Sequence, residues 1–195
     1  NLIDGDMLIA AFAKDMKERG ALNGDTAVVT VMSNIGFKHF ARENGIHVAE
    51  TGVGDRYVLE EMVKHNFSIG GEQSGHIIFR EFATTGDGQL TGVQFASIMA
   101  RTGKKASELA GAMQAFPQTM VNVKASPALK ELLKTDETIK AAITGVADRL
   151  GDDGRILVRA SGTEPLIRVM IEGKNIKEIA AMAKEVAAVI ESKAE

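Results

Sequence analysis

The sequence has no cysteine and no tryptophan, and only three of its 195 residues are proline. The absence of cysteine excludes disulfide bonds and thiolate metal sites, which agrees with a reducing compartment. No apolar run approaches the roughly 18 residues that a membrane-spanning helix needs. The first residues form neither a basic leader nor a signal-like stretch, and no initiator methionine is present. We therefore expect a cytoplasmic protein, cut from a longer chain, without a membrane partner.

An excess of charge of one sign is also missing. The formal net charge is -3, with 25% charged and 45% hydrophobic residues, which is ordinary for a globular protein. Without a broad positive field, a nucleic-acid backbone is not expected as a partner. The four histidines, at positions 39, 47, 65 and 76, lack metal-ligand spacing. We therefore expect no metal site in this chain.

Residues 1–113 alternate helical and strand patterns. Asp6 is expected to cap the first helix, which Gly20 ends. A later helix over residues 55–65 is expected to bury Tyr57, Met62 and Val63. The pattern predicts a mixed α/β sheet with helices on both faces. The other expected helices are 35–44 and 90–101, and the expected strands are 26–32, 46–51, 67–69 and 76–79.

Residues 117–195 have a different pattern, which predicts a small α+β domain. Strands are expected over 119–123, 155–159 and 166–172, with a helix opened by Thr135 or Asp136 between the first two. The last helix has one apolar stripe at spacings of three and four residues, which favours packing on its own sheet over a coiled-coil seam, for which the stripe is short. That stripe consists of Ile176, Ile179, Ala183, Val186 and Ile190.

The segment from Arg159 to Arg168 has the composition of an anion-binding loop. Ser161 and Thr163 offer hydroxyl groups, and Gly162 lets the backbone fold around an anion. Arginine adds a planar fork that contacts two phosphate oxygens together. These residues alone leave open a polar hairpin turn with two solvent-facing arginines. Strand alternation places both arginines away from the expected core residues, Ile156, Val158, Ile167, Val169 and Ile171.

A second candidate site is the glycine-flanked segment Gly70 to His76. If it is locally extended, Glu72, Ser74 and His76 project from one side of the chain. A carboxylate that accepts from neighbouring hydroxyls can hold a sugar, and His76 can move a proton near neutral pH. A glycine-rich turn with polar filler remains the alternative for these residues alone.

Together the two segments resemble the α-D-phosphohexomutase superfamily, whose members have four domains around one cleft. The segment from Gly71 to His76 resembles the sugar-binding loop of the third domain, and that from Arg159 to Arg168 resembles the phosphate-binding loop of the fourth. Gln73, the segment from Thr51 to Val58 and that from Thr84 to Gly88 are similar to the phosphoglucosamine mutase branch.

The resemblance implies that residues 1–113 are the third domain and residues 117–195 the fourth, with a TATA-box-binding-protein-like topology. It implies an isomerase of amino-sugar metabolism, serving cell-wall precursor synthesis, that interconverts glucosamine 6-phosphate and glucosamine 1-phosphate. A phosphoserine and a bisphosphate intermediate carry that reaction. The implied sugar-binding residues are Glu72, Ser74, His76, Gly54, Asp55 and Arg56, and the implied phosphate-binding residues are Arg159, Ser161, Gly162, Thr163 and Arg168.

The reacting groups of that superfamily are not found in this sequence. Neither the serine loop nor the magnesium loop with three aspartates is present, since Asp4-Gly5-Asp6 lacks the third aspartate and the arginine. The resemblance therefore implies that upstream domains supply the serine and Mg²⁺, and that this chain alone is inactive, with His76 as the one proton-transfer candidate. A phosphomannomutase or phosphoglucomutase fragment and a stand-alone phosphosugar-binding module remain alternatives.

Overall fold

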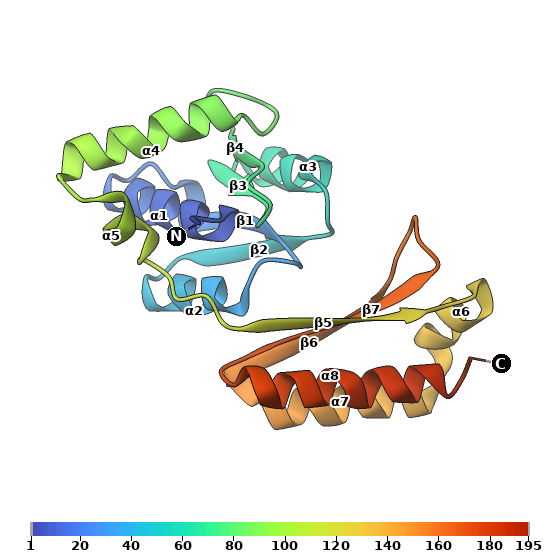
Figure 1. The fold of residues 1–195 in the computed structure, drawn as a ribbon. Coiled ribbons are helices and arrows are strands. Elements are labelled where there is room, and N and C mark those ends of the chain that lie inside the picture. The colour runs from blue at the N-terminus through green and yellow to red at the C-terminus, as the bar shows by residue number, and fades with distance from the viewer. Residues whose placement is uncertain (1, 195) are drawn as a thin grey trace. The chain divides into compact units, whose positions relative to one another are not determined.

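The computed structural model describes residues 2–194 and divides into two compact units, Asn1–Ala115 and Phe116–Glu195 (Figure 1). Each unit has its own sheet and its own buried apolar cluster, so each is described by itself. Among the described residues, no helix is both long enough and apolar enough to span a bilayer.

Unit 1 is a four-stranded sheet in the order β2-β1-β3-β4, in which β1 pairs parallel with β2 and β3, and β4 is antiparallel to β3. Its strands are β1 Thr26–Thr30, β2 His47–Thr51, β3 Ile69–Gly71 and β4 Ile77–Phe79. Its helices are α1 Gly5–Glu18, η1 Asn23–Asp25, α2 Ile35–Glu43, α3 Asp55–His65, α4 Gly88–Thr102 and α5 Ala106–Ala110.

Both faces of this sheet are covered by helices, which confirms the predicted architecture. Every residue of β1 is buried, and neighbouring side chains go to opposite faces. Ala27 and Val29 pack in the cluster that includes α1, whereas Val28 packs with Val58 and Met62 of α3. A strand enclosed in this way has apolar residues at consecutive positions rather than at every second one.

The predicted cap of the first helix is wrong by two residues. Asp4 is the N-cap of α1, and its carboxylate accepts from the Met7 backbone N–H at 3.0 Å. Asp6 lies in the first turn of the helix, fully buried, and accepts from the Asn34 backbone N–H at 2.8 Å. Both aspartates satisfy the local cap pattern, so only the packing of Asp6 against the start of α2 distinguishes them.

The buried side of α3 was also predicted partly wrongly, although its bounds are as expected. Val58 and Met62 are fully buried, while Tyr57 and Val63 are 52% and 59% exposed. Residues 58 and 62 are four apart and share a face, and each neighbour is rotated by about 100° away from it. Tyr57 instead lies near Gly54, so the ring sits at the loop that precedes the helix.

Unit 2 is a three-stranded antiparallel sheet in the order β5-β7-β6. Helix α6 was not predicted, although Ser126 caps it by accepting from the Leu129 N–H at 3.2 Å and Pro127 occupies the first turn. The elements are β5 Gln118–Lys124, α6 Pro127–Thr135, α7 Glu137–Leu150, η2 Gly151–Asp153, β6 Gly154–Ala160, β7 Leu166–Gly173 and α8 Ile176–Glu191.

The helices of unit 2 pack on one face of its sheet, as predicted for an α+β domain. Ile167, Val169 and Ile171 are fully buried against apolar side chains of α6, α7 and α8. Ile176, expected in the apolar stripe, is 49% exposed because it is the first residue of α8. Arg159 and Arg168 alternate with apolar residues that pack in or against this cluster, and therefore belong to the other face of the sheet.

Candidate functional site

The glycine-flanked loop of unit 1 lies at the edge where the parallel strands end. Strands β1, β2 and β3 all run toward this edge, and the loops after β2 and β3 contain residues 52–54 and 72–76. In open α/β sheets, ligands bind beyond the carboxyl ends of the strands. The topology therefore brings the two candidate sugar-binding segments together, although 18 residues separate Gly54 from Glu72 in the sequence.

Glu72 connects these two loops directly. Its carboxylate accepts from the Gly54 backbone N–H at 3.0 Å, and Gly54 has φ 131°, in the region that favours glycine. The start of α1 closes the third side, because the Gly5 N–H donates to the Gln73 carbonyl at 2.9 Å. Glu72 is thus held at the junction of three segments, with one carboxylate oxygen directed to the backbone.

The loop itself is a turn, so the condition of local extension is not met. The Gly75 N–H donates to the Glu72 carbonyl at 2.9 Å, and the Glu72 N–H donates to the His76 carbonyl at 3.0 Å. Gly75 has φ 101°, which an extended strand does not allow. The common side of Glu72, Ser74 and His76 therefore cannot be argued from strand alternation.

Three polar side chains around this turn are available to a ligand. Within residues 2–194, no side-chain hydrogen bond or ion pair involves Ser74, His76 or Asp55. Gly86 lies against His76: a Cβ added at Gly86 would lie 3.2 Å from the Cβ of His76. The turn thus has a hydroxyl, an imidazole and two carboxylates with unused hydrogen-bonding capacity.

Arg56, the sixth candidate of this group, has a different environment. Its Nε donates to Glu60 on the next turn of α3 at 2.8 Å, and the side chain is 81% exposed. This hydrogen bond raises the pKa of Arg56 above its ordinary value. The guanidinium lies along the outer surface of α3.

The two arginines of the unit 2 segment are direct cross-strand neighbours. Arg159 of β6 and Arg168 of β7 are register partners, and Asn122 of β5 is the partner of Arg168 on the other side. Side chains of opposed residues lie about 5 Å apart at Cβ, and like charges placed so are destabilising. Two guanidinium groups and an amide thus form one row on the face away from the helices.

An internal carboxylate offsets part of this repulsion. Glu164 forms an ion pair with Arg168, while Arg159 has no side-chain partner within the described range 2–194. Glu164 is half exposed, so an anion in solution can compete with it for the arginine fork. The row has positive charge and planar guanidinium donors, the features by which arginine binds phosphate.

The loop between these strands is a tight turn with two unused backbone donors. Ser161, 6% exposed, accepts through its hydroxyl from the Glu164 N–H at 3.2 Å, and its own N–H donates to the Leu166 carbonyl at 2.8 Å. The N–H groups of Gly162 and Thr163 have no partner in the described part of the chain. Adjacent amides of this kind bind anions.

One residue at this loop was missed by the sequence analysis. Lys130, on helix α6, donates through Nζ to the carbonyls of Ser161 and Glu164 at 2.6 and 2.7 Å. The signal that could have located it is the Ser126-Pro127 start of a helix, which was not recognised. Even with that helix, 31 residues separate Lys130 from Ser161, and no local pattern predicts the contact.

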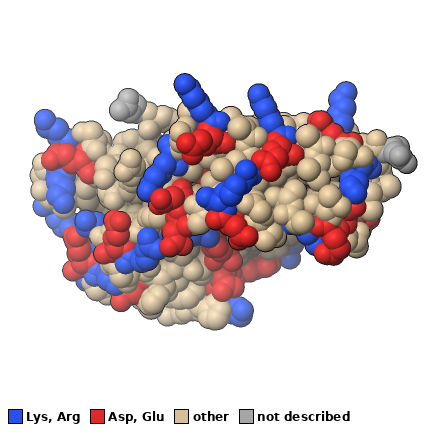
Figure 2. Space-filling model, turned by 90° about the horizontal axis from the view of Figure 1, so that it is seen from below, with Lys and Arg blue, Asp and Glu red and all other residues tan. Residues whose placement is uncertain are grey.

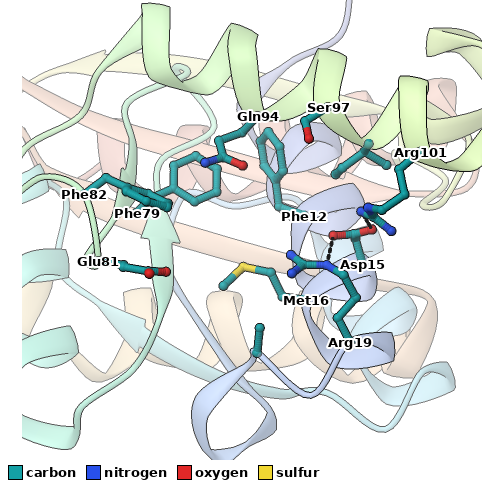
Figure 3. A pocket seen from close by; sticks show the side chains of 12 residues that line it. Phe12, Asp15, Met16, Arg19, Phe79, Glu81, Phe82, Gln94, Ser97 and Arg101 are labelled. Atoms are coloured by element: carbon teal, nitrogen blue, oxygen red, sulfur yellow. Dashed lines mark hydrogen bonds and ion pairs between the residues drawn. The ribbon is translucent and has the colours of Figure 1, made fainter.

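A separate hollow of about 180 Å³ lies between α1 and α4 (Figure 3). Asp15, whose side chain is 6% exposed, accepts from Arg19 Nε at 2.8 Å and also pairs with Arg101, so it connects the two helices. Phe12 packs edge-to-face against Phe79 on its apolar side. Asp15 is ten residues along α1 from Gly5, or about 15 Å. This hollow is therefore distinct from the loop of residues 72–76, which Gly5 contacts.

The side chains that are present do not fit a magnesium site. No group of three or more His, Cys, Asp or Glu residues that could hold a metal exists among residues 2–194. Asp4 caps α1 and Asp6 accepts from the Asn34 backbone, so both carboxylates already have structural partners. No metal chemistry is therefore assigned to this chain.

Surface charge is mixed rather than of one sign. On the face drawn in Figure 2, Lys and Arg side chains alternate with Asp and Glu. The described ion pairs are mostly exposed contacts within one helix or between neighbouring elements, which contribute little to stability. The local concentration of positive charge at Arg159 and Arg168 is thus a feature of the loop, not of a broad basic field.

Comparison with known proteins gives the class to which this fold and these two loops belong. Residues 4–116 match the family model described as phosphoglucomutase/phosphomannomutase, alpha/beta/alpha domain III, and residues 120–189 match the C-terminal domain of the same family. The chain belongs to the phosphoglucomutase/phosphomannomutase family. The predicted superfamily resemblance is confirmed.

The similarity to named relatives is more specific. The chain is 54% identical over 193 residues to phosphoglucosamine mutase of Caldanaerobacter subterraneus subsp. tengcongensis, and 53% identical over 188 residues to that of Leifsonia xyli subsp. xyli. The alignments cover 99% and 96% of this chain, but 43% and 41% of the two relatives. The chain therefore spans less than half the length of these proteins, and the predicted resemblance to the phosphoglucosamine mutase branch is confirmed.

Solved structures agree on the fold. A variant of Aspergillus fumigatus N-acetylphosphoglucosamine mutase in complex with glucose 1,6-bisphosphate has a TM-score of 0.80 at 19% identity, covering 98% of this chain and 44% of that one. A phosphoglucomutase/phosphomannomutase family protein of Burkholderia thailandensis has a TM-score of 0.78 at 20% identity, covering 98% and 42%. At these identities the likeness concerns the fold alone.

Proposed function

We propose that this chain is the substrate-binding part of a phosphoglucosamine mutase, in which residues 1–113 bind the sugar and residues 117–195 bind the phosphate. The observation that carries the proposal is the cross-strand pair Arg159 and Arg168 beside the two unpaired amides of Gly162 and Thr163. Such a pair is destabilising without a counter-charge, and a phosphate supplies that charge. Identity of about half to phosphoglucosamine mutases supports glucosamine phosphates as the substrate class.

The proposed reaction explains why a sugar-binding site and a separate phosphate-binding site are both needed. The enzyme interconverts glucosamine 6-phosphate and glucosamine 1-phosphate through a phosphoserine and a bisphosphate intermediate. In each half-reaction one phosphate reacts while the other must be anchored. Arg159, Ser161, Gly162, Thr163 and Arg168 would anchor that second phosphate, supplying positioning and charge stabilisation, the main contributions in phosphoryl transfer.

The sugar itself would be held at the turn of unit 1. Glu72 would accept hydrogen bonds from ring hydroxyls, Ser74 would donate to or accept from them, and His76 would transfer a proton. Asp55 offers a second carboxylate, and Gly54 lets the ring approach the backbone. Arg56 lies on the outer surface of α3, so its contribution is the weakest of this group.

The reacting groups would come from upstream domains of the parent enzyme, which are also its proposed partners and would bind Mg²⁺. We expect the 195-residue chain alone to show no mutase turnover, because a serine loop and a triple-aspartate loop are absent from its sequence. A coupled assay with glucosamine 1-phosphate, its bisphosphate and Mg²⁺ measures this. Turnover above the rate of a heat-denatured sample would contradict the proposal that the reacting groups lie in upstream domains.

Replacing Glu72 with alanine is expected to weaken binding of glucosamine 6-phosphate by about tenfold, the value of one hydrogen bond to a charged group. Binding of inorganic phosphate should be unchanged, because the phosphate loop is in the other unit. Titration followed by NMR measures both affinities. Glu61→Ala is the matched control, since Glu61 lies on α3 and, within residues 2–194, forms ion pairs only with Lys64 and His65. Equal loss of both ligands would argue against a sugar role.

A mutase acting on neutral sugars remains the competing member of the family. Parallel titrations with glucosamine 6-phosphate, glucose 6-phosphate and mannose 6-phosphate distinguish the two. Tighter binding of the amino sugar is the expected result, and a preference for either neutral sugar would transfer the proposal to phosphoglucomutase or phosphomannomutase. Binding of inorganic phosphate without any sugar phosphate would leave only an anion-binding module.

A further inference from the structure

Lys130 lies outside the loop from Ser161 to Glu164 and contacts the backbone carbonyls of that loop. Its Nζ donates at 2.6 Å to the Ser161 carbonyl and at 2.7 Å to the Glu164 carbonyl, the two ends of the turn. Both distances are short, as expected for hydrogen bonds from a charged donor. One cation thus joins the two carbonyls that bracket Gly162 and Thr163.

Helix α6 holds Lys130 in place. Ser126 caps the helix, Pro127 fixes its first turn, and Leu129 is 2% exposed in the core of unit 2. The residue next to Lys130 is therefore anchored in the apolar cluster, with Leu133 packing against the same cluster one turn later. The ammonium group reaches the loop from a rigid element rather than from another loop.

Because the Ser161 carbonyl and the Gly162 N–H belong to one peptide group, the contact with Lys130 also fixes the direction of that N–H. The described chain has no cis peptide bond, so the Ser161–Gly162 peptide is trans. A trans peptide points its C=O and its N–H to opposite sides. Because Lys130 binds the Ser161 carbonyl, the Gly162 N–H is directed away from Lys130. That N–H has no partner within residues 2–194.

We propose that Lys130 is a positioning residue of the phosphate site: it holds the Ser161 and Glu164 carbonyls so that the Gly162 amide is presented to the anion. The inference rests on the proposed phosphate role of the loop. Lys130 also keeps two negative carbonyl ends turned from the bound charge, and its ammonium adds to the positive potential from Arg159 and Arg168. It acts through the backbone and need not touch the phosphate.

The test compares Lys130→Met with Lys134→Met, which removes an exposed ammonium of the same helix paired to Glu131. Inorganic phosphate and glucosamine are titrated separately into the ¹⁵N-labelled 195-residue chain. We expect Lys130→Met to weaken phosphate binding by about tenfold, the value of one charged hydrogen bond, with glucosamine unaffected. Lys134→Met should bind both ligands as the unaltered chain does.

The amide resonance of Gly162 provides a readout that a merely structural role would not move. In the unaltered chain, phosphate should shift the Gly162 and Thr163 amides most strongly. In Lys130→Met at saturation the Gly162 shift should fall by more than half, whereas Lys130→Arg, which keeps charge and donors, should restore it. If Lys130→Met does not fold, Lys130→Gln, which removes the charge but keeps a neutral amide donor group, replaces it, and both losses should be in the same direction.

The outcomes separate this inference from the function on which it rests. If the unaltered chain binds no phosphate and the Gly162 amide does not shift, both fail. If phosphate binds and Arg168→Ala abolishes binding, but Lys130→Met binds normally with an unchanged Gly162 shift, only the role of Lys130 is overturned. A loss in Lys130→Met that Lys130→Arg does not restore, with equal loss of glucosamine, would also overturn it.

Discussion

Replacing Arg168 with alanine is expected to weaken binding of glucosamine 6-phosphate by about 100-fold, while binding of glucosamine stays unchanged. The estimate follows from the loss of charge-assisted hydrogen bonds to the phosphate, worth roughly 1.5–3 kcal/mol. Arg168 is the centre of the row that also contains Arg159 and Asn122. Its loss therefore removes the donor that has neighbours on both sides.

The measurement is NMR titration of the two ligands at one fixed, low ionic strength, because salt screens this interaction. Arg149→Ala serves as the control: Arg149 also lies in unit 2 and is 47% exposed, but it pairs with Glu185 of α8. It should bind both ligands normally. Equal weakening of the phosphorylated and unphosphorylated sugars by Arg168→Ala would refute the phosphate role.

Replacing Gly5 with alanine is expected to lower the free energy of unfolding of unit 1 by about 3 kcal/mol, at the upper end of the usual cost of overpacking. An added Cβ would lie 2.0 Å from the Glu72 carbonyl oxygen and 2.8 Å from the Gly75 nitrogen. Both are backbone atoms, so the turn that holds Glu72 and Ser74 must move. Sugar binding should be lost together with stability.

Urea unfolding followed by circular dichroism measures the stability, and glucosamine titration measures the site. Gly92→Ala is the control, because Gly92 lies within α4 and an added Cβ meets nothing within 4 Å. Removing a glycine from a helix there should stabilise unit 1 by about 0.5–1 kcal/mol. Gly5→Ala with the stability and sugar affinity of the unaltered chain would show that the turn is not held by α1.

Much of the fold follows from short sequence signals. The bounds of α3 and the buried strand β1 are predictable because caps, glycines and apolar runs lie within a few residues of the elements they define. Errors arose where two residues offered the same signal. Asp4 and Asp6 both fit a cap, and Tyr57 and Val58 are adjacent residues with large hydrophobic surfaces, so only packing against the sheet and α2 decides between them.

The sequence by itself determined the two loop motifs, the residue types they contain and the family that they indicate. Only the tertiary structure decided which groups meet: Glu72 at the Gly54 amide, Arg159 opposite Arg168, and Lys130 at the Ser161 carbonyl. The reason is the separation along the sequence over which each kind of interaction acts. Helix caps and apolar periods act over a few residues, whereas strand register and contacts across 18 or 31 residues depend on how whole elements pack.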